Sequence, residues 1–203
     1  MDQVVSAVME AIHKAGFVEI EVSARHVHLS QADVERLFGP GATLEPKRPL
    51  SQPGQFLSEQ RVTLIGPKGR KERTAVLGPA RKATQVELSQ SDCVDLGIQA
   101  PVRESGDVEG SAPITIEGPC GTIHLEEGAI IAHNHIHVTA PDSVMLDLHD
   151  KQRVSVEVMS DRPGVFRDGI IRVSTEFSCK MHIDFDEANA AMVKGFTLGK
   201  IIR

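Results

Sequence analysis

Two short segments of this chain constrain its fold more than any other feature, because they repeat one pattern of residue types. HVHLS at residues 26–30 and HIHVT at residues 135–139 agree in type at every position. Each alternates histidine with an apolar residue, the period of two that is typical of a β-strand with two different faces. Their separation of about a hundred residues indicates an internal duplication, so we expect two related halves.

The rest of the chain alternates short strand patterns with turns rich in glycine and proline. Alternating apolar and polar residues predict, among others, strands at 17–24, 61–69, 128–139 and 153–161. A short helix is predicted at 31–39, with Ser30 as its N-cap. This pattern indicates a mainly β fold, as in barrels or sandwiches, with a few short α-helices.

Composition argues against several classes of function. Aromatic residues make up 3% of the chain, with no Trp or Tyr, and the net charge is −6, so we expect no nucleic-acid binding. No apolar run is long enough to cross a membrane. Three cysteines without a C-x-x-C pair predict reduced thiols in a reducing compartment. Residues 1–16 do not resemble a secretory signal and predict an amphipathic helix, either packed on its own domain or serving as a docking tag.

The paired histidines predict metal binding. Side chains at i and i+2 of a strand share a face about 7 Å apart, so two imidazoles can converge on one Zn²⁺, and a third ligand completes an open site. When the halves are aligned, Glu87 lies over His182. We therefore predict two ligand sets, which make a bimetallic site if the repeats face each other: His26, His28 and Glu87, and His135, His137 and His182.

The sequence leaves open the roles of the other histidines and the identity of the metal ion. His133 shares the strand pattern of His135, but the first half has Ala24 there, so it is left as a supporting residue or a further ligand. His13, His124 and His149 lack such partners and are predicted to be surface groups. Zinc suits histidine-rich open sites, although Co²⁺, Mn²⁺ or Fe²⁺ could occupy them.

A basic segment at residues 61–82 predicts an anion site, with a solvated face as the alternative. Arg81 is its informative member because it lies six residues before Glu87, and an arginine can hold phosphate with two parallel hydrogen bonds. The aligned position in the second half is Glu176. Arg81 therefore breaks the symmetry of the duplication, which favours a functional role.

Four motifs in order resemble the phosphate propanoyltransferases, the phosphotransacylases of bacterial propanediol utilisation: VSARHVHLS, LGPARKATQVELS, HNHIHVT and SCKMHIDFDEANA. The resemblance spans residues 19–195, nearly the whole chain. It implies two β-barrel-like domains with short capping α-helices and a dinuclear zinc site between them. It also implies a homodimer and the interconversion of acyl-CoA plus phosphate with acyl phosphate plus coenzyme A.

Carried onto this sequence, the resemblance makes the six residues named above the ligands of two zinc ions per chain, and it makes Arg81 the phosphate contact. It implies a first barrel at about 25–130 and a second built from about 17–24 plus 131–203, after a helix at 1–16. It further implies a bacterial cytoplasmic location, with a bacterial microcompartment as a possible site. The phosphates of coenzyme A would meet basic residues, for which the candidates are Lys68, Arg70, Lys71 and Arg73.

The expected reaction is direct attack of phosphate on the thioester of propanoyl-CoA or another short-chain acyl-CoA. Cys179 is the one tempting nucleophile, and we expect it to pack structurally instead. The alternatives are a zinc-dependent thioester or amide hydrolase and a non-catalytic metal-binding β-barrel. A cupin would pair H-x-H with a nearby Glu, but Leu-Ser-Gln-Ala-Asp follows His28. The sequence does not indicate which acyl chain length is preferred or in which direction the reaction runs in the cell.

Overall fold

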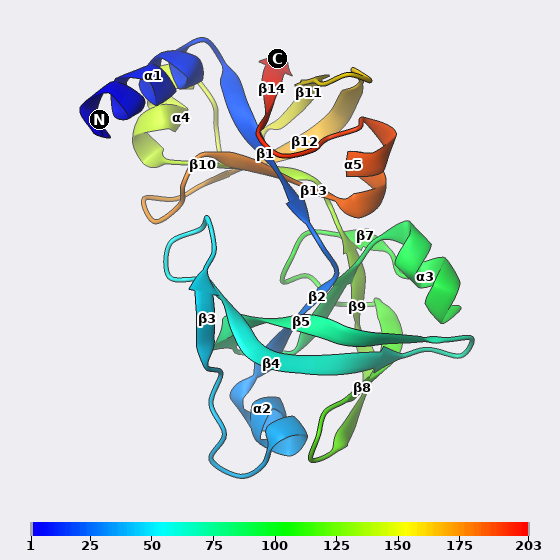
Figure 1. Cartoon of the computed structure of the whole chain (residues 1–203). Helices are drawn as coiled ribbons and strands as arrows, with labels where there is room; N and C mark the ends of the chain where they lie inside the picture. The colour runs from blue at the N-terminus through cyan, green and yellow to red at the C-terminus, as the bar shows by residue number, and fades with distance from the viewer. Residues whose placement is uncertain (1, 203) are drawn as a thin grey trace. The chain divides into compact units, whose positions relative to one another are not determined.

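The computed structural model describes residues 2–202, which divide into two compact units (Figure 1). Unit 1 comprises Met1–Ser23 and His133–Arg203, and unit 2 comprises Ala24–Ala132. Each unit has its own apolar core, in which Ile136 and Ile171 are fully buried in unit 1, and Val76 and Val86 in unit 2. The division is therefore between two bodies that each pack around a separate interior.

Unit 1 contains a closed barrel of six strands. Its order around the barrel is β1 (Phe17–Ser23), β13 (Lys180–Asp184), β10 (His135–Val138), β12 (Val165–Val173), β11 (Arg153–Met159) and β14 (Thr197–Ile202). Only β1 comes from the N-terminal end of the chain. It lies between β13, to which it is parallel, and β14, to which it is antiparallel.

Six strands of unit 2 also pair in a closed ring, because β8 bonds to both β4 and β9. Around the ring they are β4 (Phe56–Ile65), β5 (Arg70–Arg81), β2 (His26–Ser30), β6 (Gln85–Leu88), β9 (Thr122–Ala132) and β8 (Ala112–Glu117). Two short strands extend the sheet, β3 (Pro46–Pro49) beside β4 and β7 (Val102–Arg103) beside β9.

The two barrels share one pairing pattern. β2 is parallel to β5 and antiparallel to β6, just as β10 is parallel to β12 and antiparallel to β13. β1 leads into β2 and β9 leads into β10, yet β1 pairs within unit 1 and β9 within unit 2. Each half of the duplication thus places its first strand in the other unit. The predicted mainly β fold, with two barrel-like domains and short helices, is confirmed.

A short helix begins directly after each of the strands β2, β6, β10 and β13. These helices are α2 (Gln31–Phe38), α3 (Gln90–Leu96), α4 (Ala140–Leu146) and α5 (Phe185–Ala190). The side chains of Ser30, Ser89, Thr139 and Asp184 cap them by accepting a hydrogen bond from a backbone N–H of the first turn. The hydroxyl residue of each repeated segment is therefore a helix N-cap, which ends the strand just past the histidines.

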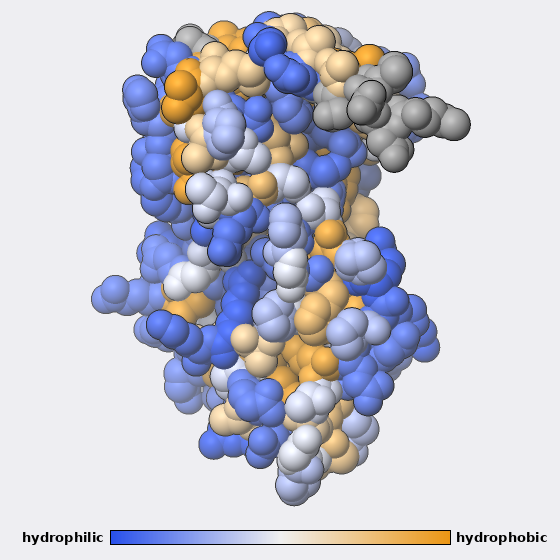
Figure 2. Space-filling model, turned by 90° about the vertical axis from the view of Figure 1, so that its left-hand side faces the viewer, coloured by the Kyte–Doolittle hydropathy of each residue, from blue (hydrophilic) through white to orange (hydrophobic). Residues whose placement is uncertain are grey.

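The remaining helix, α1 (Asp2–Lys14), precedes β1. Within residues 2–202, no helix has the length and apolar character that a membrane crossing requires. Hydrophilic residues cover most of the face in Figure 2, with hydrophobic residues in small groups between them. That distribution fits a chain whose apolar side chains are gathered in the two barrel interiors.

Replacing Gly66 with alanine should lower the free energy of unfolding by about 1–3 kcal/mol, the usual cost of forcing atoms into a packed site. A Cβ at Gly66 would lie 2.3 Å from the backbone oxygen of Leu96 at the end of α3. Urea unfolding measures the change. Gly164→Ala is the control, because a Cβ there meets nothing within 4 Å; equal midpoints for both variants would contradict this account of the packing.

Candidate metal centres

The first predicted ligand set lies together on two neighbouring strands of unit 2. His26 on β2 faces Glu87 on β6 in direct register. His26 Nε2 lies 3.2 Å from His28 Nε2 and 3.4 Å from Glu87 Oε2, and His28 Nε2 lies 3.8 Å from Glu87 Oε1. All three side chains are buried, so water does not screen this cluster.

The second predicted set has the same strand register in unit 1, but its ligand atoms lie farther apart, since they do not all come within 4.8 Å of one another as those of the first set do. His135 on β10 faces His182 on β13 in direct register, as His26 faces Glu87. The ring centroids of His135 and His137 are 4.7 Å apart, and those of His135 and His182 are 5.2 Å apart. The Phe177 ring packs against His137 at a centroid distance of 4.1 Å and an interplanar angle of 31°, which restricts the orientation of that imidazole.

Backbone carbonyl groups fix the first imidazole of each pair. His26 Nδ1 lies 2.8 Å from the carbonyl oxygen of Ala24, and His135 Nδ1 lies 2.9 Å from that of His133. A carbonyl oxygen only accepts hydrogen bonds, so each Nδ1 carries the proton in the neutral ring. The lone pair is then on Nε2, the nitrogen that would bind a metal, and such outer hydrogen bonds are typical of metal-bound histidines.

The second imidazole of each pair is held in its neutral form. Burial lowers the pKa of His28 to about 2, with further lowering by His26 and Arg81. Burial likewise lowers the pKa of His137 to about 2, helped by His135, His182 and Arg172. Their Nδ1 atoms have no hydrogen-bond partner within the described residues. Neutral, buried and incompletely bonded imidazoles are the state in which histidine donates a lone pair to a metal.

The geometry of the first set fits a bound zinc ion. Tetrahedral ligands at about 2.0–2.1 Å from Zn²⁺ are about 3.4 Å from one another. The separations of 3.2 and 3.4 Å from His26 Nε2 match that value, and 3.8 Å is close to it. Two nitrogens and one carboxylate also form a common donor set for an open zinc site. The residues present therefore fit the ion that the sequence predicts.

Arg81 lies at the end of β5, beside this first set. It is half-buried, and its Nη1 donates to Ser105 Oγ at 3.2 Å. Ser105 also accepts from Gln85 Nε2 at 3.0 Å, and the same amide nitrogen donates to Glu87 Oε1 at 2.7 Å. A polar network thus links the predicted phosphate contact to a predicted ligand.

Sequence reasoning missed Gln85, Ser105 and Arg172. Gln85 is two residues before Glu87 on the same strand, so its place on the ligand face was available from the alternation. Ser105 comes from the loop after β7, and nothing local indicated it. Arg172 on β12 is in register with His137 on β10, and its counterpart beside His28 is Leu77. An arginine therefore neighbours each histidine set, from two different strands.

The four basic residues proposed for coenzyme A lie elsewhere, at the opposite end of β5. Arg70 and Arg81 bound this strand of 12 residues, so its ends are separated by up to about 35 Å. Arg70 pairs with Glu117 at 2.8 Å, and Lys71 pairs with Asp92 at 3.2 Å and with Asp95. Lys68 and Arg73 are exposed. The structure does not bring these four residues together with Arg81.

His133 and Asn134 lie between β9 and β10, so the single strand predicted at 128–139 was wrong. His133 Nε2 is 3.8 Å from Asp168 Oδ2, and His133 is not part of the strand pairing that places His135 opposite His182.

His124 and His149 are exposed, as predicted. Cys179 is buried, and burial together with Asp142 raises the pKa of its thiol to about 12. This thiol is poorly suited to act as a nucleophile.

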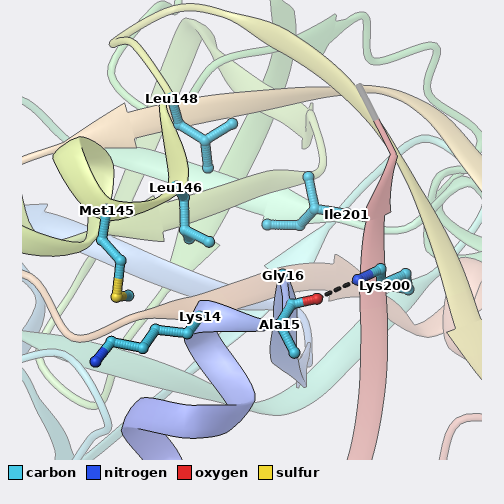
Figure 3. A pocket seen from close by; sticks show the side chains of 8 residues that line it. All are labelled: Lys14, Ala15, Gly16, Met145, Leu146, Leu148, Lys200 and Ile201. Carbon is cyan, nitrogen blue, oxygen red and sulfur yellow. Dashed lines mark hydrogen bonds between the residues drawn. The ribbon is translucent and has the colours of Figure 1, made fainter.

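Unit 1 also contains a cavity of about 280 Å³, formed by the end of α1, by α4 and by β14 (Figure 3). Lys14 and Met145 lie on one side of it and Ile201 on another, and Lys200 Nζ donates to the carbonyl oxygen of Ala15. None of the six predicted metal ligands lines this cavity. It is therefore separate from the histidine sets.

Comparison with known proteins identifies one family. The sequence profile of the family described as phosphate propanoyltransferase matches residues 19–194. A phosphate propanoyltransferase of Clostridioides difficile is 45% identical over 203 residues, which cover 100% of this chain and 97% of the relative. Its counterpart in Thermotoga maritima is 47% identical over 190 residues, covering 93% and 90%. That of Lachnoclostridium phytofermentans is 48% identical over 191 residues, covering 93% and 88%.

Proposed function

Since this chain belongs to the phosphate propanoyltransferase family, we propose that it interconverts acyl-CoA plus phosphate with acyl phosphate plus coenzyme A at two zinc ions. The set His26, His28 and Glu87 would hold one ion, and the set His135, His137 and His182 the other. One observation carries the proposal: each barrel presents three ligand-capable side chains at equivalent positions of equivalent strands. A metal-binding role explains why both halves of the duplication contain such a set.

When bound, zinc supplies a Lewis acid that polarises the thioester carbonyl and stabilises the oxyanion that develops on it. Arg81 would hold phosphate by charge-assisted hydrogen bonds beside the first set. A phosphate oxygen then attacks the thioester carbon, a C–O bond forms, and the C–S bond breaks to release the thiolate of coenzyme A. Holding both reactants in place removes much of the entropic barrier.

The chain's own residues preorganise this reaction. Gln85 donates to Glu87 Oε1 and to Ser105, and the backbone N–H of Gly106 donates to Gln85 Oε1 at 2.7 Å. These bonds hold Glu87 and Arg81 before substrate arrives. Cys179 is 8% exposed and packs in the core of unit 1, which supports direct attack by phosphate without an enzyme-bound acyl group.

The proposed substrate class rests on the family. The relatives named above are phosphate propanoyltransferases, so propanoyl-CoA is the first acyl donor to test and a role in propanediol degradation is the proposed context. We also propose a homodimer in the bacterial cytoplasm, or inside a bacterial microcompartment, on the basis of the family resemblance. Lys68, Arg70, Lys71 and Arg73 remain the proposed contacts for coenzyme A, although two of them pair with carboxylates.

The test is release of the coenzyme A thiol from acetyl-, propanoyl- and butanoyl-CoA, with and without phosphate. We expect thiol release only when phosphate is present, together with an equal amount of acyl phosphate. Thiol release at the same rate without phosphate would instead identify a zinc-dependent thioester hydrolase. Absence of thiol release from protein of known metal content would leave a metal-binding barrel without this activity.

A further inference from the structure

Three ligand-capable side chains meet in unit 1 outside the two histidine sets. His13 is in the last turn of α1, Asp142 is in the first turn of α4, and Cys179 immediately precedes β13. One ligand atom from each lies within 4.8 Å of the other two. Cys179 packs in the core with Met181, whereas His182 alternates to the other face of the strand. This cluster is therefore on the opposite face of the strand from the second histidine set.

A buried nitrogen of this cluster has no hydrogen-bond partner within residues 2–202. His13 Nδ1 is 3.9 Å from Asp142 Oδ1, too far for a hydrogen bond. His13 Nε2 is buried and has no hydrogen-bond partner within residues 2–202. The other carboxylate oxygen of Asp142 accepts from the Thr139 hydroxyl at 2.7 Å, which fixes the side chain. A buried imidazole nitrogen in this state is unfavourable unless a ligand satisfies it.

The donor types select a class of metal. Thiolate, imidazole and carboxylate together are ligands of Zn²⁺, whereas Ca²⁺ and Mg²⁺ take oxygen ligands. A metal ion removes the proton from a coordinating thiol, even one whose pKa burial has raised, as it has for Cys179. The charges then cancel, since one thiolate and one carboxylate balance Zn²⁺. A neutral complex suits side chains that are only 14% exposed for His13, 19% for Asp142 and 8% for Cys179.

We propose that His13, Asp142 and Cys179 bind a third zinc ion, which fixes α1 to α4 and to the start of β13. The ion would have a structural purpose, because the cavity of Figure 3 lies between Lys14 at the end of α1, the α4 segment and β14. A bound metal ion would add stabilisation that apolar contacts do not provide at this position. The proposal does not depend on the acyltransferase reaction, since no ligand is shared with the histidine sets.

Cobalt substitution provides the test. Metal-free full-length protein is reconstituted with Co²⁺, and the near-ultraviolet charge-transfer band from thiolate to cobalt is recorded together with bound cobalt per chain. None of the six histidine-set ligands is a cysteine, so this band reports only on a cysteine-containing site. We expect the band in the wild-type protein and its loss, with one cobalt fewer per chain, in Cys179→Ser.

Two further variants keep the result interpretable. Cys120→Ser removes an exposed thiol outside the cluster and should keep the band and the stoichiometry. His13→Asn alters a helix end without emptying the core and should lose one cobalt per chain with an unchanged circular dichroism spectrum. A wild-type protein without the band, a band that Cys179→Ser leaves intact, or a His13→Asn protein with full stoichiometry would each overturn the proposal.

Discussion

Replacing His28 with alanine is expected to lower phosphate-dependent acyl transfer by about a thousandfold or more. Metal-ion stabilisation of a developing oxyanion contributes several kcal/mol, and each 1.36 kcal/mol of barrier is tenfold in rate. His28 is 3% exposed, and its Nε2 lies 3.2 Å from that of His26, so its removal takes away a buried donor atom of the first set. The measurement is kcat alongside the zinc content of the purified protein, which should fall by one ion per chain.

Controls separate loss of the ion from loss of the fold. His149→Ala removes an exposed histidine that belongs to neither set and should retain both activity and zinc. His28→Asn fills most of the buried volume and should lose zinc as His28→Ala does, with a wild-type circular dichroism spectrum. A His28→Ala protein with full zinc content and wild-type turnover would contradict the assignment of this set.

Replacing Arg81 with alanine is expected to lower kcat/KM for phosphate by about 10- to 100-fold. Hydrogen bonds to a charged group contribute about 1.5–3 kcal/mol. Because each 1.36 kcal/mol corresponds to a tenfold change in rate, this energy corresponds to a loss of about 10- to 100-fold. The KM for phosphate should rise more than the KM for acyl-CoA, because Arg81 is assigned to one substrate only. Arg81→Lys should recover part of the loss, since lysine keeps the charge without the planar fork of donors.

The matched control is Arg36→Ala, in the same unit. Arg36 is exposed on α2 and pairs only with the nearby Asp33 in the described part of the chain, so its removal should leave both KM values unchanged. Equal rises in the two KM values for Arg81→Ala would point to a distorted site. An unchanged KM for phosphate would remove Arg81 from the phosphate site.

The parts of this protein that local pattern controls were predictable. The alternation of His26, Val27 and His28 placed both histidines on one face of a strand, and in the structure Val27 packs in the core of unit 2. Ser30 was predicted as an N-cap and is one. Aligning the halves placed Glu87 over His182, and these two residues occupy equivalent register positions.

The parts that depend on distant partners could not be predicted from local pattern, and a division of the chain near residue 130 entered only as an implication of the family resemblance. The H-x-H alternation runs on through His133, so no local feature marks the break before β10. The two strands belong to different units because β9 pairs with β6 in unit 2, whereas β10 pairs with β13 in unit 1. His13 was predicted to be a surface group, and this was wrong, because Asp142 and Cys179 meet it from far along the chain.

Anomalous X-ray scattering on either side of the zinc absorption edge tests the central claim most directly. We predict one zinc peak among His26, His28 and Glu87 and another among His135, His137 and His182, in crystals of protein that is active with phosphate. Active protein with no zinc or other metal peak at either histidine set would contradict the account, because the duplicated ligands would then have no metal to bind.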